Sequence, residues 1–194
     1  MLRCRNAVGF FMCAIAAVAA GCASTPQSRF YTLSATTAPS ASTSTLSVSV
    51  GPVSVPAVVD RPQIVVSTGA NQVKLDEFNR WAAPLQDSLA GVIAEDLAGI
   101  LGTPSVTVFP ADSSAGAQYR VAVELQRFES TPGVSTVLDA TWTVRRTKDG
   151  VAQTGRTNVR EPVQDKSFDA LAAAHSRAAG VLSKDIADAI STMQ

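Results

Sequence analysis

Residues 119–144 read YRVAVELQRFESTPGVSTVLDATWTV, and the alternation of apolar with polar side chains in this stretch decides the fold class. Successive side chains of a β-strand point to opposite faces, so alternation predicts a strand with one buried face. The buried positions are Tyr119, Val121, Val123 and Leu125 in the first run, and Leu138, Ala140, Trp142 and Val144 in the second. Thr131-Pro132-Gly133 separates the runs and predicts a turn between two antiparallel strands.

The chain after this stretch extends the sheet and then forms a helix. Asp149-Gly150 is typical of a tight hairpin, which predicts a third strand over residues 151–160. Apolar side chains then recur every three or four residues from Phe168 to about Met193, which predicts a long helix with Ser167 as its N-cap. The apolar stripe comprises Phe168, Leu171, Ala174, Ala178, Val181, Leu182, Ile186 and Ile190.

A second helix is predicted upstream, over residues 84–101. Pro84 suits a first helical turn, while Gly102 and Pro104 end the helix. Its apolar stripe comprises Leu85, Leu89, Val92, Ile93, Leu97, Ile100 and Leu101. A short strand is expected over residues 105–109.

Two further strands are expected near the N-terminus. Residues 29–33 indicate a short first strand, and residues 46–55 begin with strict alternation of apolar and polar side chains. Because proline cannot donate a ladder hydrogen bond, Pro52 and Pro56 restrict the second of these strands to a sheet edge or to an early end.

A hairpin is expected between that strand and the first helix. Asp60-Arg61-Pro62 predicts a turn, residues 63–67 predict a strand, and residues 72–75 are expected to pair back on it. The elements together predict one α+β domain over residues 46–194, an antiparallel β-sheet with two main helices packed on one face. Because strands precede a helix in both halves, a duplicated strand-strand-helix unit is a further hypothesis.

The first 21 residues have the parts of a secretory signal. Arg3 and Arg5 precede an apolar run of 14 residues, from Ala7 to Ala20. A membrane-spanning helix needs about 20 apolar residues, so a cleaved signal peptide is the better interpretation. Small residues then lead directly to Cys22, an arrangement that resembles the bacterial lipobox. We therefore expect Cys22 to be lipidated, with an ordinary secreted protein as the alternative.

The lipobox interpretation implies a membrane anchor. The position three residues before the cysteine is Ala19, where leucine is commonest. Lipoproteins of this type usually carry three acyl chains, palmitate among them, and two or more chains anchor a protein stably. Ala23, in place of aspartate, favours the outer membrane and a domain that faces the periplasm. Residues 22–45 are expected to form a lipidated tether, the short first strand and a flexible loop that has nothing to bury.

Composition excludes several classes of function. Removal of the signal leaves 14 basic and 16 acidic residues, and this balance gives no basic face for a nucleic-acid partner. Cys4 and Cys13 leave with the signal, so the domain has neither a disulfide nor a cysteine metal site. We expect no cofactor and no metal.

The sequence contains no recognisable catalytic set. His175 is the only histidine, and Asp76 and Glu77 are adjacent, which on a strand points them to opposite faces. We therefore expect no enzyme, with Asp76 and Glu77 in a solvated loop. The basic residues 145–148 could meet lipid headgroups, but an exposed strand end explains them more simply. Trp81 is interpreted as a core anchor under the helix start, with a partner contact as the alternative.

A longer pattern between Val50 and Leu101 resembles the ABC-type transport auxiliary lipoproteins, the paraquat-inducible protein C family. The residues that carry the resemblance are Tyr31-Thr32-Leu33, Gly51-Pro52-Val53, Pro56, Asp60-Arg61-Pro62-Gln63-Ile64-Val65, Asn71, Arg80-Trp81 and Pro84-Leu85. The chain departs from the family at Ala83, where many members have glutamate.

The resemblance implies a non-catalytic docking subunit of a lipid-transport system built around MCE-domain proteins. It implies a homo-oligomeric ring at the outer membrane, anchored through acylated Cys22, with phospholipid contact as a further expectation. The rival hypothesis is a lipoprotein that itself binds a lipid or another apolar ligand in a pocket between sheet and helices. We interpret Asp60, Arg61, Pro62 and Trp81 as structural determinants rather than ligands.

Overall fold

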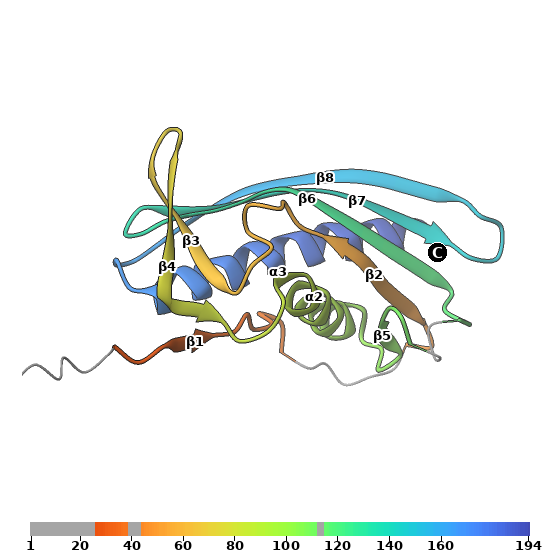
Figure 1. Ribbon diagram of the computed structural model, residues 1–194. Helices are drawn as coiled ribbons and strands as arrows, with labels where there is room; N and C mark the ends of the chain where they lie inside the picture. The colour runs from red at the N-terminus through yellow and green to blue at the C-terminus, as the bar shows by residue number, and fades with distance from the viewer. Residues whose placement is uncertain (1–25, 39–43, 112–114) are drawn as a thin grey trace, which may run out of the picture.

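The computed structural model describes residues 26–38, 44–111 and 115–194, and it places them in two mixed β-sheets and two long helices (Figure 1). The predicted signal peptide and Cys22 lie outside the described residues. The alternating stretch over residues 119–144 forms two neighbouring strands of the larger sheet.

The larger sheet has five strands in the order β5-β2-β6-β7-β8. Their bounds are Val106–Val108 for β5, Val48–Ser54 for β2, Tyr119–Thr131 for β6, Ser135–Arg146 for β7 and Ala152–Pro162 for β8. The last three strands form the predicted antiparallel meander, whereas β2 pairs in parallel with both β5 and β6.

The smaller sheet has the strand order β1-β4-β3. Strands β3 (Gln63–Gly69) and β4 (Gln72–Trp81) form the predicted antiparallel hairpin, although β4 runs well beyond Leu75. Strand β1 (Arg29–Tyr31) pairs in parallel with the end of β4. The hairpin rises beside one end of the larger sheet (Figure 1).

Both helices lie against the same face of the five-stranded sheet, as predicted (Figure 1). Helix α2 (Leu85–Leu101) ends at Gly102, whose φ of 60° is left-handed. Helix α3 (Phe168–Thr192) begins after Ser167, whose side chain accepts a hydrogen bond from the Ala170 amide. Pro84 occupies the N-cap of α2 rather than its first turn.

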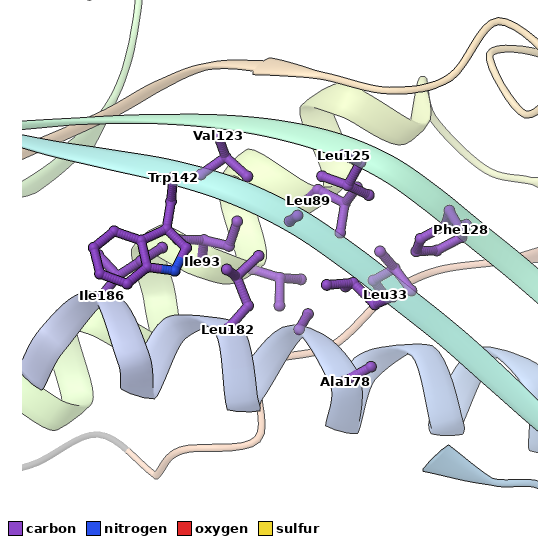
Figure 2. Close-up of a cluster of buried hydrophobic side chains, with 14 of the residues drawn as sticks. Leu33, Leu89, Ile93, Val123, Leu125, Phe128, Trp142, Ala178, Leu182 and Ile186 are labelled. Atoms are coloured by element: carbon purple, nitrogen blue, oxygen red, sulfur yellow. The ribbon is translucent and has the colours of Figure 1, made fainter. Parts of the chain in front are cut away.

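The core lies between the five-stranded sheet and the two helices. Figure 2 shows its side chains, contributed by α2 (Leu89, Ile93), α3 (Ala178, Leu182, Ile186), β6 (Val123, Leu125, Phe128), β7 (Trp142) and the segment after β1 (Leu33). These are the predicted apolar stripes and alternating positions, and each large side chain buried this way contributes about 1.5–3 kcal/mol. Leu33 belongs to the same core although it precedes residue 46.

The structure confirms the α+β class and the packing of the helices, and it differs from the predicted sheet in two respects. The sheets are mixed rather than antiparallel, and β2 is an interior strand rather than an edge, although it ends early, at Ser54, as the alternative had it. Pro52 fits there because β5 pairs with β2 only as far as Val50 and the register with β6 shifts between Val50 and Val53. The duplicated unit stays a prediction.

Candidate functional site

The segment Leu33–Ala38, here called the strap, crosses helices α2 and α3 after β1. The backbone amides of Thr36 and Thr37 donate to Oδ1 of Asp96, over 2.8 and 2.9 Å. The amide of Ser34 donates to the hydroxyl of Ser176 on α3, over 3.1 Å. The strap is therefore hydrogen-bonded to both helices, which differs from the expected loop with nothing to bury.

Two glycines let the strap approach the helices closely. A Cβ atom on Gly180 would lie 2.1 Å from Oγ1 of Thr36, and one on Gly99 would lie 2.7 Å from Cγ2 of Thr37. Any side chain at these positions would displace the strap. A third helical glycine, Gly91, has nothing within 4 Å of the same position, so its lack of a side chain serves no comparable contact.

Asp96 is the functional residue that sequence reasoning missed. Its side chain is fully buried, and its second oxygen, Oδ2, has no hydrogen-bond partner in the described part of the chain. The residue lies three positions after Ile93 and directly before Leu97, within the apolar stripe of α2. An aspartate on a buried stripe is rarely found without partners, and that was the available signal.

Trp81 lies where β1, the β3–β4 hairpin and α2 meet. Its amide donates to the carbonyl of Pro62 over 2.7 Å, and the next amide, of Ala82, donates to the carbonyl of Tyr31 over 2.9 Å. The Trp81 side chain is buried, as expected for a core anchor. The carbonyl of Pro84 then accepts the first hydrogen bonds of α2. This junction fixes the start of the strap to the start of α2.

A buried aromatic cluster supports the junction from the other side. The imidazole of His175 stacks on Phe128 with ring centroids 3.8 Å apart, and Trp81 meets both rings edge-on at 6.2 Å. Nε2 of His175 hydrogen-bonds with the hydroxyl of Ser130 over 2.8 Å. Full burial lowers the pKa of His175 to about 3, so the ring stays neutral at physiological pH. With no exposed surface, the ring cannot meet a substrate.

The other family residues lie on turns and at strand irregularities. Asp60 and Arg61 occupy the predicted turn, in which both the Val59 and the Asp60 amides donate to the carbonyl of Pro56. The described residues contain no ion pair between Asp60 and Arg61; Arg61 instead reaches the carbonyl of Ala57. Arg80 donates through Nε to the carbonyl of Glu77, over 3.0 Å. Their roles stay predictions.

Gly51 and Pro52 lie apart from the junction, in the interior strand β2. The φ of Gly51 is +125°, and a Cβ atom there would lie 3.2 Å from that of Phe109. Only glycine accommodates this backbone together with the close approach of the residue after β5. The family pattern thus falls on two separate places in the fold.

Asp76 and Glu77 lie on β4 rather than in a loop. Oδ1 of Asp76 accepts the amides of Phe78 and Asn79 and the side-chain amide of Asn79, over 2.8–3.1 Å. Burial alone would raise the pKa of Asp76, but these hydrogen bonds hold it below its ordinary value. The carboxylate therefore shapes the irregular turn of β4 and forms no acid-base pair with Glu77.

The basic residues at the end of β7 form hydrogen bonds with the β7–β8 turn and the C-terminus. Arg146 donates to both carboxylate oxygens of Asp149 and to the carbonyl of Met193, and Arg145 donates to the carbonyl of Gly150. The β7–β8 turn that follows them lies at the opposite end of the molecule from β1 (Figure 1). This arrangement agrees with an exposed strand end.

Cavities lined by described residues lie at the margins of the fold. A cavity of about 420 Å³ lies between the β1–strap segment and α3, and one of about 330 Å³ lies beside the β3–β4 hairpin. A third, of about 270 Å³, lies at the C-terminus, where its lining includes Tyr119 and Arg146. No three histidine, cysteine, aspartate or glutamate side chains converge in the described ranges.

The strap, the junction around Trp81 and the family residues all lie within a segment that matches a known protein family. The model of the ABC-type transport auxiliary lipoprotein component matches residues 31–187, from β1 through most of α3. The chain belongs to this family. The match confirms the resemblance carried by Gly51-Pro52, Asp60-Arg61-Pro62 and Arg80-Trp81, and it identifies a transport-associated lipoprotein component. None of the curated proteins matches.

Solved structures share the fold of this family member. An uncharacterized protein matches with a TM-score of 0.71 at 18% identity, covering 85% of this chain and 99% of its own. A protein from Xanthomonas campestris matches with a TM-score of 0.63 at 16% identity, covering 86% and 99%. Within the described residues, no helix is long and apolar enough to cross a membrane.

Proposed function

We propose that this protein is the non-catalytic outer-membrane lipoprotein subunit of an MCE-type lipid-transport system, and that it docks the transport tube at the envelope. Family membership supplies the coarser part, a lipoprotein component of a transport system. The observation that carries the docking role is the early attachment of the chain to the domain, by β1 at Arg29 and then by the strap. A lipid anchor can hold a docking partner in place only if the chain between anchor and domain is short.

The pairing of β1 with β4 keeps that chain short, and the strap holds the residues that follow β1. Because β1 pairs with β4 and the strap is bound by Asp96, the first fixed strand begins at Arg29, seven positions after Cys22. An extended chain spans at most about 3.3–3.6 Å per residue, so the domain lies within roughly 25 Å of its acyl chains. A loop without packing partners up to residue 45 would have allowed a reach about three times longer.

The filled core supports docking over the rival function of carrying a lipid. The rival needs an apolar pocket between sheet and helices, and side chains from both layers occupy that space (Figure 2). The cavity of about 420 Å³ lies at the domain margin instead, between the β1–strap segment and α3, and its lining includes the polar residues Asp169, Ser176 and Arg177. A stoichiometric lipid that co-purifies with the protein after acyl-chain removal would favour the rival.

Replacement of the anchor tests the proposal. Cys22→Ala should release the folded protein from the outer-membrane fraction into the periplasm and abolish lipid transport in cells. Far-ultraviolet circular dichroism and the melting temperature of the released protein should match those of the acylated protein. Ala23→Ser is the matched control and should stay in the membrane fraction. A Cys22→Ala strain with full transport would contradict the anchoring role.

We propose further that the subunit forms a homo-oligomeric ring around the tube. Light scattering of the purified acylated protein in detergent measures its mass directly. A ring predicts a mass many times that of the monomer at micromolar concentration. A monomer at high concentration would contradict the ring and leave the anchored docking role to be judged by the Cys22 variant.

A further inference from the structure

Two exposed phenylalanines lie at the end of the domain to which the tether attaches. Phe30 of β1 is 64% exposed, and Phe78 of β4 is 40% exposed. Phe30 pairs with Arg80, and Phe78 lies two positions before Arg80, so the two residues are one diagonal step apart on neighbouring strands. Two large aromatic side chains exposed on neighbouring strands call for an occupant.

The charges around the two rings suit a lipid surface. Arg29 is exposed directly before Phe30, and the Arg80 side chain is 36% exposed. The acidic side chains nearby are Asp76, whose Oδ1 accepts the amide of Phe78 over 3.1 Å, Glu77, whose carboxylate lies 4.0 Å from the Arg80 guanidinium, and Asp169 at the exposed start of α3. Aromatic rings flanked by arginines are typical of the headgroup region, where rings enter the apolar boundary and guanidinium groups reach phosphates.

The position of the lipid anchor favours the bilayer as the partner of the surface around Phe30 and Phe78. This inference rests on the proposed acylation of Cys22, which lies eight positions before Phe30. Helix α3 has 25 residues and spans about 37 Å at 1.5 Å per residue, from the β1 end toward the β7–β8 turn (Figure 1). A tether of roughly 25 Å brings the β1 end to the membrane but does not by itself orient the domain.

We propose that Phe30 and Phe78 insert into the headgroup region of the bilayer that holds the Cys22 acyl chains, with Arg29 at the phosphates. The domain then stands on the membrane by its β1–β4 end. The β7–β8 turn and the C-terminus face away from the bilayer, toward the periplasm and the transport partner. The two exposed phenylalanines thus orient the tethered domain relative to the bilayer.

Tryptophan fluorescence tests this orientation in the full-length acylated protein. Phe30→Trp and Phe78→Trp place reporters in the patch, and Val151→Trp places the control at the opposite end, where Val151 is 48% exposed. The native Trp81 and Trp142 are buried and give the same background in each variant. The proteins are reconstituted in phosphatidylethanolamine and phosphatidylglycerol vesicles, with or without brominated acyl chains.

The expected result is that brominated lipid removes more than half of the added emission of both patch reporters and leaves that of Val151→Trp unchanged. Equal quenching at all three positions would overturn the orientation. A blue-shifted Phe30→Trp spectrum in a protein that also carries Cys22→Ala, in buffer without lipid or detergent, would assign the patch to a second copy of the chain and overturn it as well. Failure of the unsubstituted protein to float with vesicles would instead overturn the anchored function, and the patch with it.

Discussion

Asp96 shows how one buried carboxylate organises the start of this domain. Its Oδ1 accepts two strap amides, while Oδ2 lies buried without a partner among the described residues. Charge-assisted hydrogen bonds are each worth roughly 1.5–3 kcal/mol, and they offset the cost of removing the carboxylate from water. The residue therefore fixes the path of the strap over the two helices.

Asp96→Ala should lower the free energy of unfolding by about 2–4 kcal/mol, because the amides of Thr36 and Thr37 lose the buried carboxylate oxygen that accepts both of them. Asp96→Asn should lose less, since its side-chain oxygen can still accept both hydrogen bonds. Glu95→Ala is the matched control on the exposed side of the same helix and should change stability little. Urea unfolding measures all three variants. An Asp96→Ala protein as stable as the control would contradict the role of the strap.

His175 gives the fold a dependence on pH. Its pKa is about 3 in the folded state and about 6.5 when unfolded, so only the unfolded chain gains a proton between these values. The stabilising contribution is complete above pH 6.5 and is lost as the pH falls, by up to about 1.4 kcal/mol per pH unit. Urea unfolding from pH 6.5 to 5 should show this slope, and His175→Gln should flatten it. Identical slopes for both proteins would contradict the buried neutral imidazole.

At the scale of elements, the fit between the strap and the two helices depends on glycine. Gly99 and Gly91 lie on the same helix, but only Gly99 faces the strap at contact distance. The comparison separates two effects of glycine, because alanine favours any helix by about 1 kcal/mol relative to glycine. What remains after that gain is the cost of moving the strap.

Gly99→Ala should destabilise the protein by about 1–3 kcal/mol, since the new methyl would lie 2.7 Å from Thr37 Cγ2 and 3.0 Å from the carbonyl oxygen of Ala38. Gly91→Ala, with open space around the methyl, should stabilise it by about 0.5–1 kcal/mol. Thermal melting compares the pair. Equal and positive shifts in melting temperature would show that the strap does not rest on Gly99.

Local patterns predicted most elements of this fold, because alternation and helical stripes depend on neighbouring residues. The meander around Trp142 and the helix after Ser167 were predicted for that reason. Trp81 was interpreted as a core anchor from its place before a helix, with a partner contact as the alternative, and its side chain is buried. The parallel pairing of β1 with β4, and of β2 with β6, joins strands that are distant in sequence, and no local pattern encodes such a pairing. Asp96 was missed because the strap that satisfies it is a polar segment that resembles an unstructured loop.

At the scale of the whole molecule, the fold has two functionally different ends. One end combines β1, the strap and the exposed phenylalanines, and the sequence places the expected acyl anchor only a few residues away. The other carries the β7–β8 turn and the C-terminus (Figure 1). This polarity suits a subunit held at a membrane that presents its far end to a partner, as the proposed docking of a transport tube requires.

Isolation of the acylated protein from cross-linked envelopes tests the central claim most directly. A C-terminal affinity tag recovers the protein after brief cross-linking in cells, and mass spectrometry identifies what is joined to it. The account predicts recovery of an MCE-domain protein with the unsubstituted chain and a loss of at least tenfold with Cys22→Ala at equal protein level. Absence of any MCE-domain protein, in cells that make one, would contradict the docking role.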